Sequence, residues 1–289
     1  PRSPFGAPLS ATERCAQLTP MFHHQKKPFE IGGMKSDQKA MAILNLADSI
    51  RGIPGDIVEA GVAGGSASLS LMFFLACVGD MQDRTFHLFD TWEGLPESAH
   101  DFDKGFVKGA FGVKWDKLMS NVQKYKKIYT ERVEKYDAYG IQRRPLPWDT
   151  LWEKHVKTYK GKFDDTMPGA LADKRLAMLM CDGDMYVSTV SCLSAALPKM
   201  NAGGWIYEDD YYSFVGSFQA VRDTRAKFGY DTELSPLLLV PEDGPFKLIR
   251  EDTSDCKPPT ENLLNQYSSC NGVRACAVVW KHILLPPQV

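Results

Sequence analysis

Two acidic clusters, each directly after a short apolar run, carry the strongest chemical signal in the 289-residue sequence. The first is Asp182-Gly183-Asp184 and the second is Glu208-Asp209-Asp210. They are separated by about the length of a strand–helix–strand unit, so both clusters can reach the same edge of a parallel sheet. Carboxylates at one edge repel unless a cation joins them, and oxygen ligands suit Mg²⁺ or a similar hard ion. The alternative is that Asp182 caps the next helix and Asp209-Asp210 forms a solvated turn.

A glycine-rich segment, Glu59–Ser66, follows the first predicted strand, Asp56–Ala60. Glycines let the backbone approach a ligand closely, and a helix that starts at such a turn offers free amide donors. The spacing is Gly-x-x-Gly-Gly rather than the Gly-x-Gly-x-x-Gly of dinucleotide-binding loops, so a tight turn without a ligand is the alternative. We expect Ser66 to cap the helix that follows.

Asp90 ends a second predicted strand, Thr85–Phe89. An acidic side chain at this place commonly accepts the ribose hydroxyls of a nucleoside, and a helix cap or a surface turn is the alternative. Glu97, Asp101 and Asp103 follow on the next loop, where we expect solvated carboxylates. Taken with the acidic clusters, these features indicate an enzyme with a nucleotide-type cofactor beside a metal ion.

The composition is that of an ordinary globular protein, with 44% hydrophobic and 24% charged residues. The net charge is −2, and Lys and Arg are spread along the chain, which argues against a nucleic-acid partner. The longest apolar stretch, Leu69–Val78, is too short to span a bilayer. We therefore expect no nucleic-acid partner and no membrane partner.

The seven cysteines show no Cys-x-x-Cys pair. Cys77, Cys181 and Cys192 fall in apolar runs, which is typical of buried thiols, so we infer a reducing compartment and a cytoplasmic protein. The chain starts at Pro1 rather than Met, which leaves room for a removed targeting segment. Three further cysteines lie close enough in sequence to leave open a local disulfide or a bound ion: Cys256, Cys270 and Cys276.

The order of the predicted elements favours an α/β fold with an open, mostly parallel, doubly wound sheet. Apolar strands alternate with segments of helical periodicity. The predicted strands are Asp56–Ala60, Thr85–Phe89, Val156–Gly161, Leu176–Cys181, Trp205–Tyr207, Leu237–Val240 and Ala275–Trp280. The predicted helices are Lys35–Ile50, one that starts at Ser66, Ser188–Met200 and Gly216–Phe228, and Gly203-Gly204 is predicted to turn the chain.

We expect two parts in the chain. Residues 1–54 are an N-terminal arm, irregular over 1–30, followed by a helix. Residues 55–289 form one domain, in which a mostly helical insertion at about 102–155 serves as a lid or substrate-facing wall. Ligands of open α/β sheets bind beyond the carboxyl ends of the strands, where the predicted site residues gather.

Several segments together resemble the macrocin O-methyltransferase family, whose members use S-adenosylmethionine and Mg²⁺ to methylate sugar hydroxyls of glycosylated natural products. The resemblance covers most of residues 55–98 and 159–230. The sequence differs from the family before Gly32, between Phe102 and Val156 and from Arg250 to Val273. These regions are expected to determine which acceptor is bound. The segments that carry it are Gly55–Gly65, Phe89–Pro96, Gly161–Pro168, Cys181–Thr189 and Gly203–Tyr211.

The resemblance implies a Rossmann-like class I methyltransferase fold, S-adenosylmethionine and Mg²⁺ as cofactors, and homo-oligomers. It implies that Asp184 is the general base and that Asp182, Asp209 and Asp210 bind Mg²⁺. The residues that it assigns to the cofactor, including the methionine part, the ribose and the adenine, are Glu59, Gly61, Gly64, Ser66, Asp90, Thr91, Gly161, Phe163 and Asp182.

The predicted function is an S-adenosylmethionine- and Mg²⁺-dependent O-methyltransferase of a small-molecule acceptor, such as a sugar of a glycosylated natural product. A cation next to the methyl donor would bind a vicinal diol well, which favours such an acceptor over an isolated alcohol. Two alternatives stay open. One is an NAD(P)-dependent Rossmann-fold oxidoreductase, and the other is a non-catalytic homologue that binds the cofactor.

Overall fold

A seven-stranded sheet forms the centre of the protein in the computed structural model, which describes residues 10–20, 37–134, 145–230, 235–236 and 278–281. The spatial order is β3-β2-β1-β4-β5-β7-β6. The first five strands in this order pair in parallel, and β7 pairs antiparallel with β5 and with β6. The strands are β1 Asp56–Ala60, β2 Phe86–Asp90, β3 Val156–Lys160, β4 Leu176–Cys181, β5 Met200–Glu208, β6 Ser235–Pro236 and β7 Val278–Lys281.

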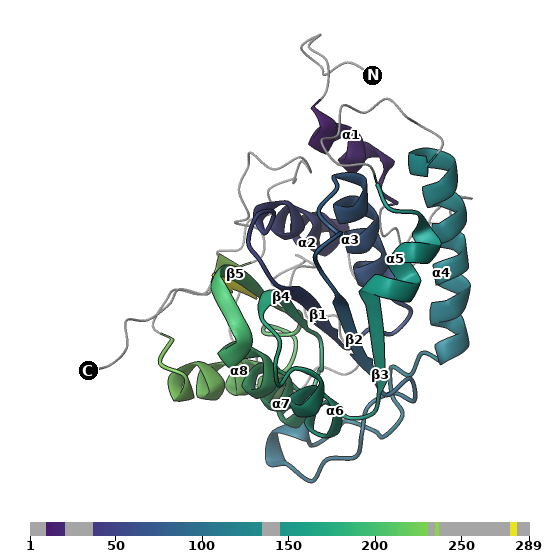
Figure 1. Cartoon of the computed structure of the whole chain (residues 1–289). Helices are drawn as coiled ribbons and strands as arrows, with labels where there is room; N and C mark the ends of the chain where they lie inside the picture. The colour runs from purple at the N-terminus through teal and green to yellow at the C-terminus, as the bar shows by residue number, and fades with distance from the viewer. Residues whose placement is uncertain (1–9, 21–36, 135–144, 231–234, 237–277, 282–289) are drawn as a thin grey trace.

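Helices cover both faces of this sheet (Figure 1). One hydrophobic core packs alternate strand residues such as Ile57 and Met178 against five helices, and the other packs Val58 and Leu179 against three. Strand β4 is buried on both faces and is apolar throughout, and β1 is buried from Ile57 to Ala60 and apolar there except for Glu59. The helices of the first face are α1 Ala11–Leu18, α2 Asp37–Ser49, α3 Ser66–Cys77, α4 Trp115–Tyr129 and α5 Trp148–His155, and those of the second are α6 Phe163–Ala170, α7 Tyr186–Ala196 and α8 Val215–Lys227.

The predicted doubly wound, mostly parallel sheet is confirmed. Two helices were not predicted. Helix α1 lies within the segment expected to be irregular, although its capping box, in which Ser10 and Glu13 bond each other's backbone amides, is a readable sequence signal. Helix α6 follows β3 and is short, with Pro168 inside it.

Gly203-Gly204, which is predicted to turn the chain, lies within β5 at a break in its pairing with β4: Met200 pairs with Leu176, but the next pair is Trp205 with Met178. Close packing between the strands requires glycine here, because a Cβ atom at Gly204 would lie 2.8 Å from the carbonyl oxygen of Ala177 on β4. The predicted strand Ala275–Trp280 corresponds to β7 where the structure describes it, and Leu237–Val240 falls outside the described residues.

The predicted insertion at 102–155 is helical over much of its described part, but its helices belong to the body of the fold. Leu118 and Val122 of α4 and Trp148 and Leu151 of α5 are buried in the same core as α3. The π-helical turn Thr130–Glu134 extends α4. The part that lies outside the helical layer is the loop between β2 and α4, which Figure 1 shows at the lower end of the sheet.

A disulfide joins Cys15 of α1 to Cys77 at the end of α3. The prediction that Cys77 is a buried thiol is therefore wrong, whereas Cys181 and Cys192 are free and buried as expected. The signal was missed because Cys15 and Cys77 are separated by 62 positions and only the packing of α1 brings them together. Among the described residues, no helix has the length and apolarity needed to cross a membrane.

Candidate active site

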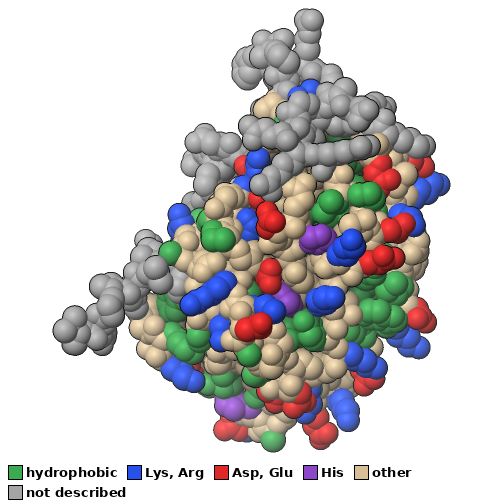
Figure 2. All heavy atoms as spheres, in the orientation of Figure 1, with side chains coloured by type: hydrophobic (Ala, Val, Ile, Leu, Met, Phe, Trp, Pro, Cys, Tyr) green, Lys and Arg blue, Asp and Glu red, His purple; other side chains and the backbone are tan. Residues whose placement is uncertain are grey.

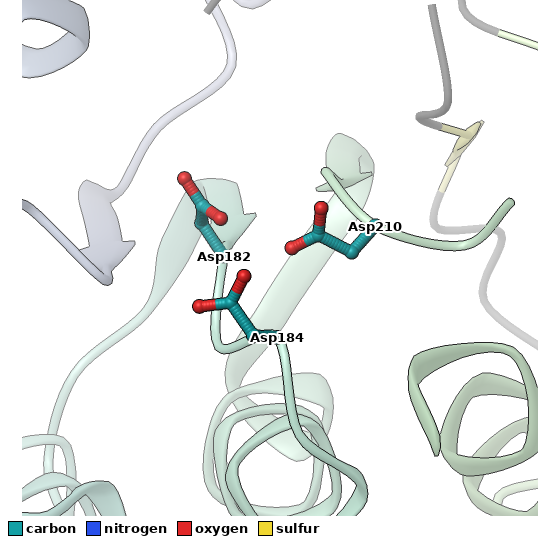
Figure 3. A group of neighbouring side chains, drawn as sticks. All are labelled: Asp182, Asp184 and Asp210. Atoms are coloured by element: carbon teal, nitrogen blue, oxygen red, sulfur yellow. The ribbon is translucent and has the colours of Figure 1, made fainter. Parts of the chain in front are cut away.

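Three aspartates from the carboxyl ends of neighbouring strands form a compact group. Asp182 and Asp184 lie between β4 and α7, and Asp210 follows β5 (Figure 3). One carboxylate oxygen from each residue lies within 4.8 Å of the others. Parallel pairing of β4 with β5 places Cys181 beside Glu208, and this register brings the two acidic clusters to one edge. The predicted convergence of the clusters is observed.

Asp210 is the most deeply buried member of this group and has an oxygen, Oδ2, without a hydrogen-bond partner. Burial, and then the negative charges of Asp184, Asp209 and Asp182, raise the pKa of Asp210 well above its ordinary value. A buried carboxylate with an unpartnered oxygen among like charges is a group that a cation would stabilise. Three oxygen donors of this kind suit Mg²⁺ or a similar hard ion, so the residues present fit the metal that the sequence predicts.

Asp209 lies beside this group, but its carboxylate turns elsewhere. Lys39 Nζ of α2 donates to Asp209 Oδ2 at 2.8 Å and to the Asp209 backbone oxygen at 3.2 Å. The Tyr207 hydroxyl donates to the other carboxylate oxygen, Asp209 Oδ1. Lys39 and Asp209 are both buried. The structure therefore groups Asp184, rather than Asp209, with Asp182 and Asp210, and Lys39 is a site residue that sequence reasoning missed.

Glu208 lies directly beneath the aspartates and is fully buried. Desolvation raises the pKa of Glu208 from 4.5 to about 8, so this side chain is largely protonated at neutral pH. A hydrogen bond of 3.1 Å joins its Oε1 to Ser217 Oγ of α8. The three members of the second acidic cluster thus differ in environment: burial raises the pKa of Glu208 and of Asp210, whereas Asp209 is paired with Lys39.

The glycine-rich segment approaches the aspartates directly. Gly61 has a φ of +94°, and a Cβ atom there would lie 1.8 Å from the carbonyl oxygen of Asp182. Only glycine allows this contact between the β1 and β4 loops. Gly64 lies against the first turns of α4, where Asn121 Nδ2 donates to its carbonyl oxygen at 2.7 Å. The predicted cofactor loop and the predicted metal site are therefore adjacent.

Glu59 and Asp90 hold this loop in place. Glu59 is buried, and its Oε2 accepts hydrogen bonds from the Ser68 amide at 3.3 Å and from the Ser68 hydroxyl. Asp90 Oδ2 accepts from the Ala63 amide at 2.8 Å, and Oδ1 accepts from the Trp92 amide at 2.6 Å. Burial raises the pKa of Asp90.

Contrary to the prediction, Ser66 does not cap α3. The N-cap position belongs to Gly65, which adopts a left-handed conformation and makes no side-chain cap, and Ser66 is the first helical residue. The cap residue therefore supplies no side-chain acceptor to the first α3 amides, and the Ser68 amide is held by Glu59 instead.

The remaining predicted residues line the same edge of the sheet. Thr91 Oγ1 donates to the carbonyl oxygen of Gly94 at 2.7 Å and shapes the turn after β2. The Gly161 amide donates to the carbonyl oxygen of Asp90 at 3.0 Å. Phe163 is buried at the start of α6, and its ring would lie 3.3 Å from a Cβ atom at Gly183. All the predicted site residues thus belong to loops or element ends that meet at one edge.

Comparison with known proteins identifies relatives of this arrangement. The family model of macrocin O-methyltransferase (TylF) matches residues 31–237. The demethyldecarbamoylnovobiocin O-methyltransferase of Streptomyces niveus is 34% identical over 182 residues, 63% of this chain and 62% of the relative. The 8-demethyl-8-(2,3-dimethoxy-alpha-L-rhamnosyl)-tetracenomycin-C 4'-O-methyltransferase of Streptomyces olivaceus is 30% identical over 193 residues, 64% of each chain. The matched part thus spans less than two thirds of these relatives.

Solved structures support the fold. The O-methyltransferase NovP superposes with a TM-score of 0.55 at 20% identity, over 95% of this chain and 96% of that chain. The calicheamicin methyltransferase CalS11 gives a TM-score of 0.51 at 18% identity, over 75% and 82%. These likenesses show a Rossmann-like methyltransferase fold. With the family model matched over most of its length, the chain belongs to the macrocin O-methyltransferase family.

Proposed function

We propose that this protein is an S-adenosylmethionine-dependent O-methyltransferase that acts on a sugar hydroxyl of a glycosylated natural product. The observation that carries the proposal is the contact between the glycine loop at Gly61 and the aspartate group at Asp182, within a chain of this family. The names of these two relatives, which describe O-methyltransferases of natural products, favour this acceptor class over a hydride acceptor.

The glycine loop and its supports would bind the cofactor. Gly61 and Gly64 would allow the cofactor to approach the backbone closely, and the first amides of α3 lie at the same place. Asp90, held against the loop at Ala63, would accept the ribose hydroxyls. S-adenosylmethionine brings the reactive methyl group, so the protein's task is to orient it toward the acceptor oxygen and to exclude water.

Asp182 and Asp210 would hold Mg²⁺, and Asp184 would accept the acceptor's proton. The metal, when bound, would lower the pKa of a coordinated hydroxyl. Mg²⁺ prefers six oxygen ligands, so these carboxylates leave positions for two neighbouring hydroxyls, which suits a vicinal diol. Asp209 would join only if its pair with Lys39 opened. Asp184, on the same loop as Asp182, lies in reach of a hydroxyl held there.

The test is an acceptor screen with the purified protein. Deglycosylated and glycosylated natural products are incubated with S-adenosylmethionine, in Mg²⁺ or in EDTA, and the products are analysed by mass spectrometry and for S-adenosylhomocysteine. We expect methylation of glycosylated compounds only, abolished by EDTA. Methylation that persists in EDTA would contradict the metal, and equal methylation of the deglycosylated compounds would contradict the sugar acceptor.

A further inference from the structure

Asp103 is a buried carboxylate on the loop between β2 and α4. It ends a short 3-10 helix, Asp101–Asp103, and only 2% of its surface is exposed. Its side chain accepts three hydrogen bonds, from the Tyr186 amide at 2.6 Å, from Ser98 Oγ at 2.7 Å and from the Val187 amide at 3.4 Å. The expectation that Asp103 is solvated is therefore wrong. Its neighbour Asp101 does face solvent.

These bonds cap helix α7 from a distant part of the chain. The N-cap residue of α7 is Met185, whose side chain makes no cap, so the first amides of α7 depend on Asp103 for an acceptor. Helix α8 closes around the same contact. A Cβ atom at Gly216 would lie 2.9 Å from the Tyr186 nitrogen and 3.2 Å from Asp103 Oδ1.

The capped amide lies two residues after Asp184. Asp184 has a φ of +57°, a left-handed conformation that is uncommon for a residue with a side chain, although Asp adopts it more readily than most. The loop that contains it is fixed at one end by the bond from the Asp182 amide to the Ala60 carbonyl oxygen, 2.8 Å long. At the other end it is fixed by the bond from the Tyr186 amide to Asp103.

The β2–α4 loop, which contains Asp103, also makes two aromatic contacts near this cap. The His100 ring stacks on Tyr186 with centroids 4.1 Å apart and planes at 10°. Phe106 packs edge-on against Phe214, the residue before α8, with centroids 5.0 Å apart. The amide of Phe214 in turn donates to the carbonyl oxygen of Asp210 at 3.1 Å. The loop is thus joined to both strand ends that carry the aspartate group.

We infer that Asp103 is a positioning residue: by capping α7 it holds Asp184 in place, and it couples the β2–α4 loop to the aspartate group. This inference rests on the proposed function, because it assigns Asp184 a task in metal-assisted methyl transfer. Outer-shell residues of metal sites commonly change metal affinity by about tenfold or more when they are removed.

The test compares three variants by calorimetric titration of Mn²⁺, used as a stand-in for Mg²⁺, and of S-adenosylmethionine. Asp103→Ala removes the cap. Asp103→Asn retains an acceptor for the Tyr186 amide, because Asn caps helices as well as Asp and Ser98 can reverse its hydroxyl. Asp101→Ala removes an exposed carboxylate from the same short helix and is the matched control.

We expect Asp103→Ala to weaken Mn²⁺ binding about tenfold with S-adenosylmethionine affinity unchanged, and Asp103→Asn and Asp101→Ala to bind both ligands like the wild type. Hydrogen exchange at Tyr186 should rise in Asp103→Ala only, because the Asn side chain keeps one oxygen as the acceptor for that amide. Faster exchange with unchanged Mn²⁺ affinity would overturn the positioning role and leave a structural cap. Equal losses in Asp103→Asn would also overturn it, since charge rather than the cap would then matter. A wild type that binds no Mn²⁺ would contradict the proposed metal site and this inference with it.

Discussion

Asp184 belongs to the aspartate group and has a left-handed backbone, two residues before the Tyr186 amide that Asp103 caps. Its two-residue spacing from Asp182 predicted a shared site, because the residue types and the strand before them are visible in the sequence. Its left-handed backbone, and the distant cap at Tyr186, depend on a contact made by Asp103 that no local pattern encodes. The same holds for Lys39, whose partner Asp209 is 170 positions away.

Asp184→Asn should abolish turnover while cofactor binding persists. Removal of a general base commonly costs about 10² to 10⁴ in rate, and Asn keeps the size of the side chain without its basicity. The measurement is the methylation rate beside the calorimetric affinity for S-adenosylmethionine. Asp164→Asn on the exposed surface of α6 is the control and should retain full activity. Normal turnover in Asp184→Asn would remove this residue from the mechanism.

Lys39→Met should destabilise the metal-free protein, because it leaves the buried Asp209 carboxylate without its cationic partner. Removal of one partner of a buried ion pair costs about 3 to 5 kcal/mol. Added Mg²⁺ should restore part of the loss, since Asp209 is then free to join Asp182 and Asp210. Urea unfolding with EDTA and with Mg²⁺ measures both effects. Lys104→Met, which breaks an exposed pair with Asp101, should unfold like the wild type.

Glu208 should make stability fall as the pH rises. Its pKa in the folded protein is about 8 against 4.5 ordinarily, so the folded state binds more protons than the unfolded state between these values. Its contribution is fully present below about pH 4.5 and is lost as the pH approaches 8, by at most about 1.4 kcal/mol per pH unit. Urea unfolding in EDTA from pH 5 to 8 should show a smaller decline in Glu208→Gln than in the wild type or in the exposed-site control Glu97→Gln. Parallel curves would contradict this assignment.

At the scale of elements, strand and helix patterns predicted the sheet well, because strands buried on both faces are apolar runs of distinctive length. The prediction failed where packing between elements overrides local signals. Gly203-Gly204 has the composition of a turn, yet it lies inside β5 at a break in the pairing with β4, where the β4 backbone leaves no room for a side chain at Gly204. Helix α4 appeared to be part of an insertion, yet its buried face completes the helical layer.

A substitution in the turn between β1 and α3 tests whether this turn binds S-adenosylmethionine. Gly61→Ala would force a Cβ atom against the Asp182 carbonyl oxygen and a side chain into a left-handed backbone, at a cost of about 2 kcal/mol or more. We expect S-adenosylmethionine affinity to fall steeply. Gly169→Ala in α6, where a Cβ atom meets nothing within 4 Å, is the matched control and should bind normally. Retained binding in Gly61→Ala would show that this turn does not contact the cofactor.

At the scale of the whole molecule, the candidate site and the disulfide lie at opposite ends of α3. The aspartate group lies at the carboxyl ends of the strands, and the Cys15–Cys77 disulfide fixes α1 at the opposite end of α3 (Figure 1). Disulfides persist in oxidising surroundings, so this pair argues against the reducing compartment inferred from the sequence. On the face in Figure 2, basic side chains lie among acidic ones.

Reduction should lower stability without changing ligand binding. A bond that closes a loop of 62 positions is worth up to about 4 kcal/mol by its effect on the unfolded chain. We expect dithiothreitol to lower the urea midpoint of the wild type and to leave S-adenosylmethionine affinity unchanged. The double variant Cys15→Ser with Cys77→Ser is the control and should be insensitive to dithiothreitol. A wild type equally insensitive would show that the bond contributes nothing.

The central claim is that the edge of the sheet at Gly61 and Asp182 binds a methyl donor beside a divalent cation. Calorimetric titration of S-adenosylmethionine into the purified protein, with and without Mg²⁺ and beside NAD⁺, tests it most directly. We expect binding of S-adenosylmethionine, a separate heat of Mg²⁺ binding that Asp210→Ala abolishes, and no binding of NAD⁺. Binding of NAD⁺ in place of S-adenosylmethionine would contradict it in favour of an oxidoreductase, and binding of neither would contradict a working methyltransferase site.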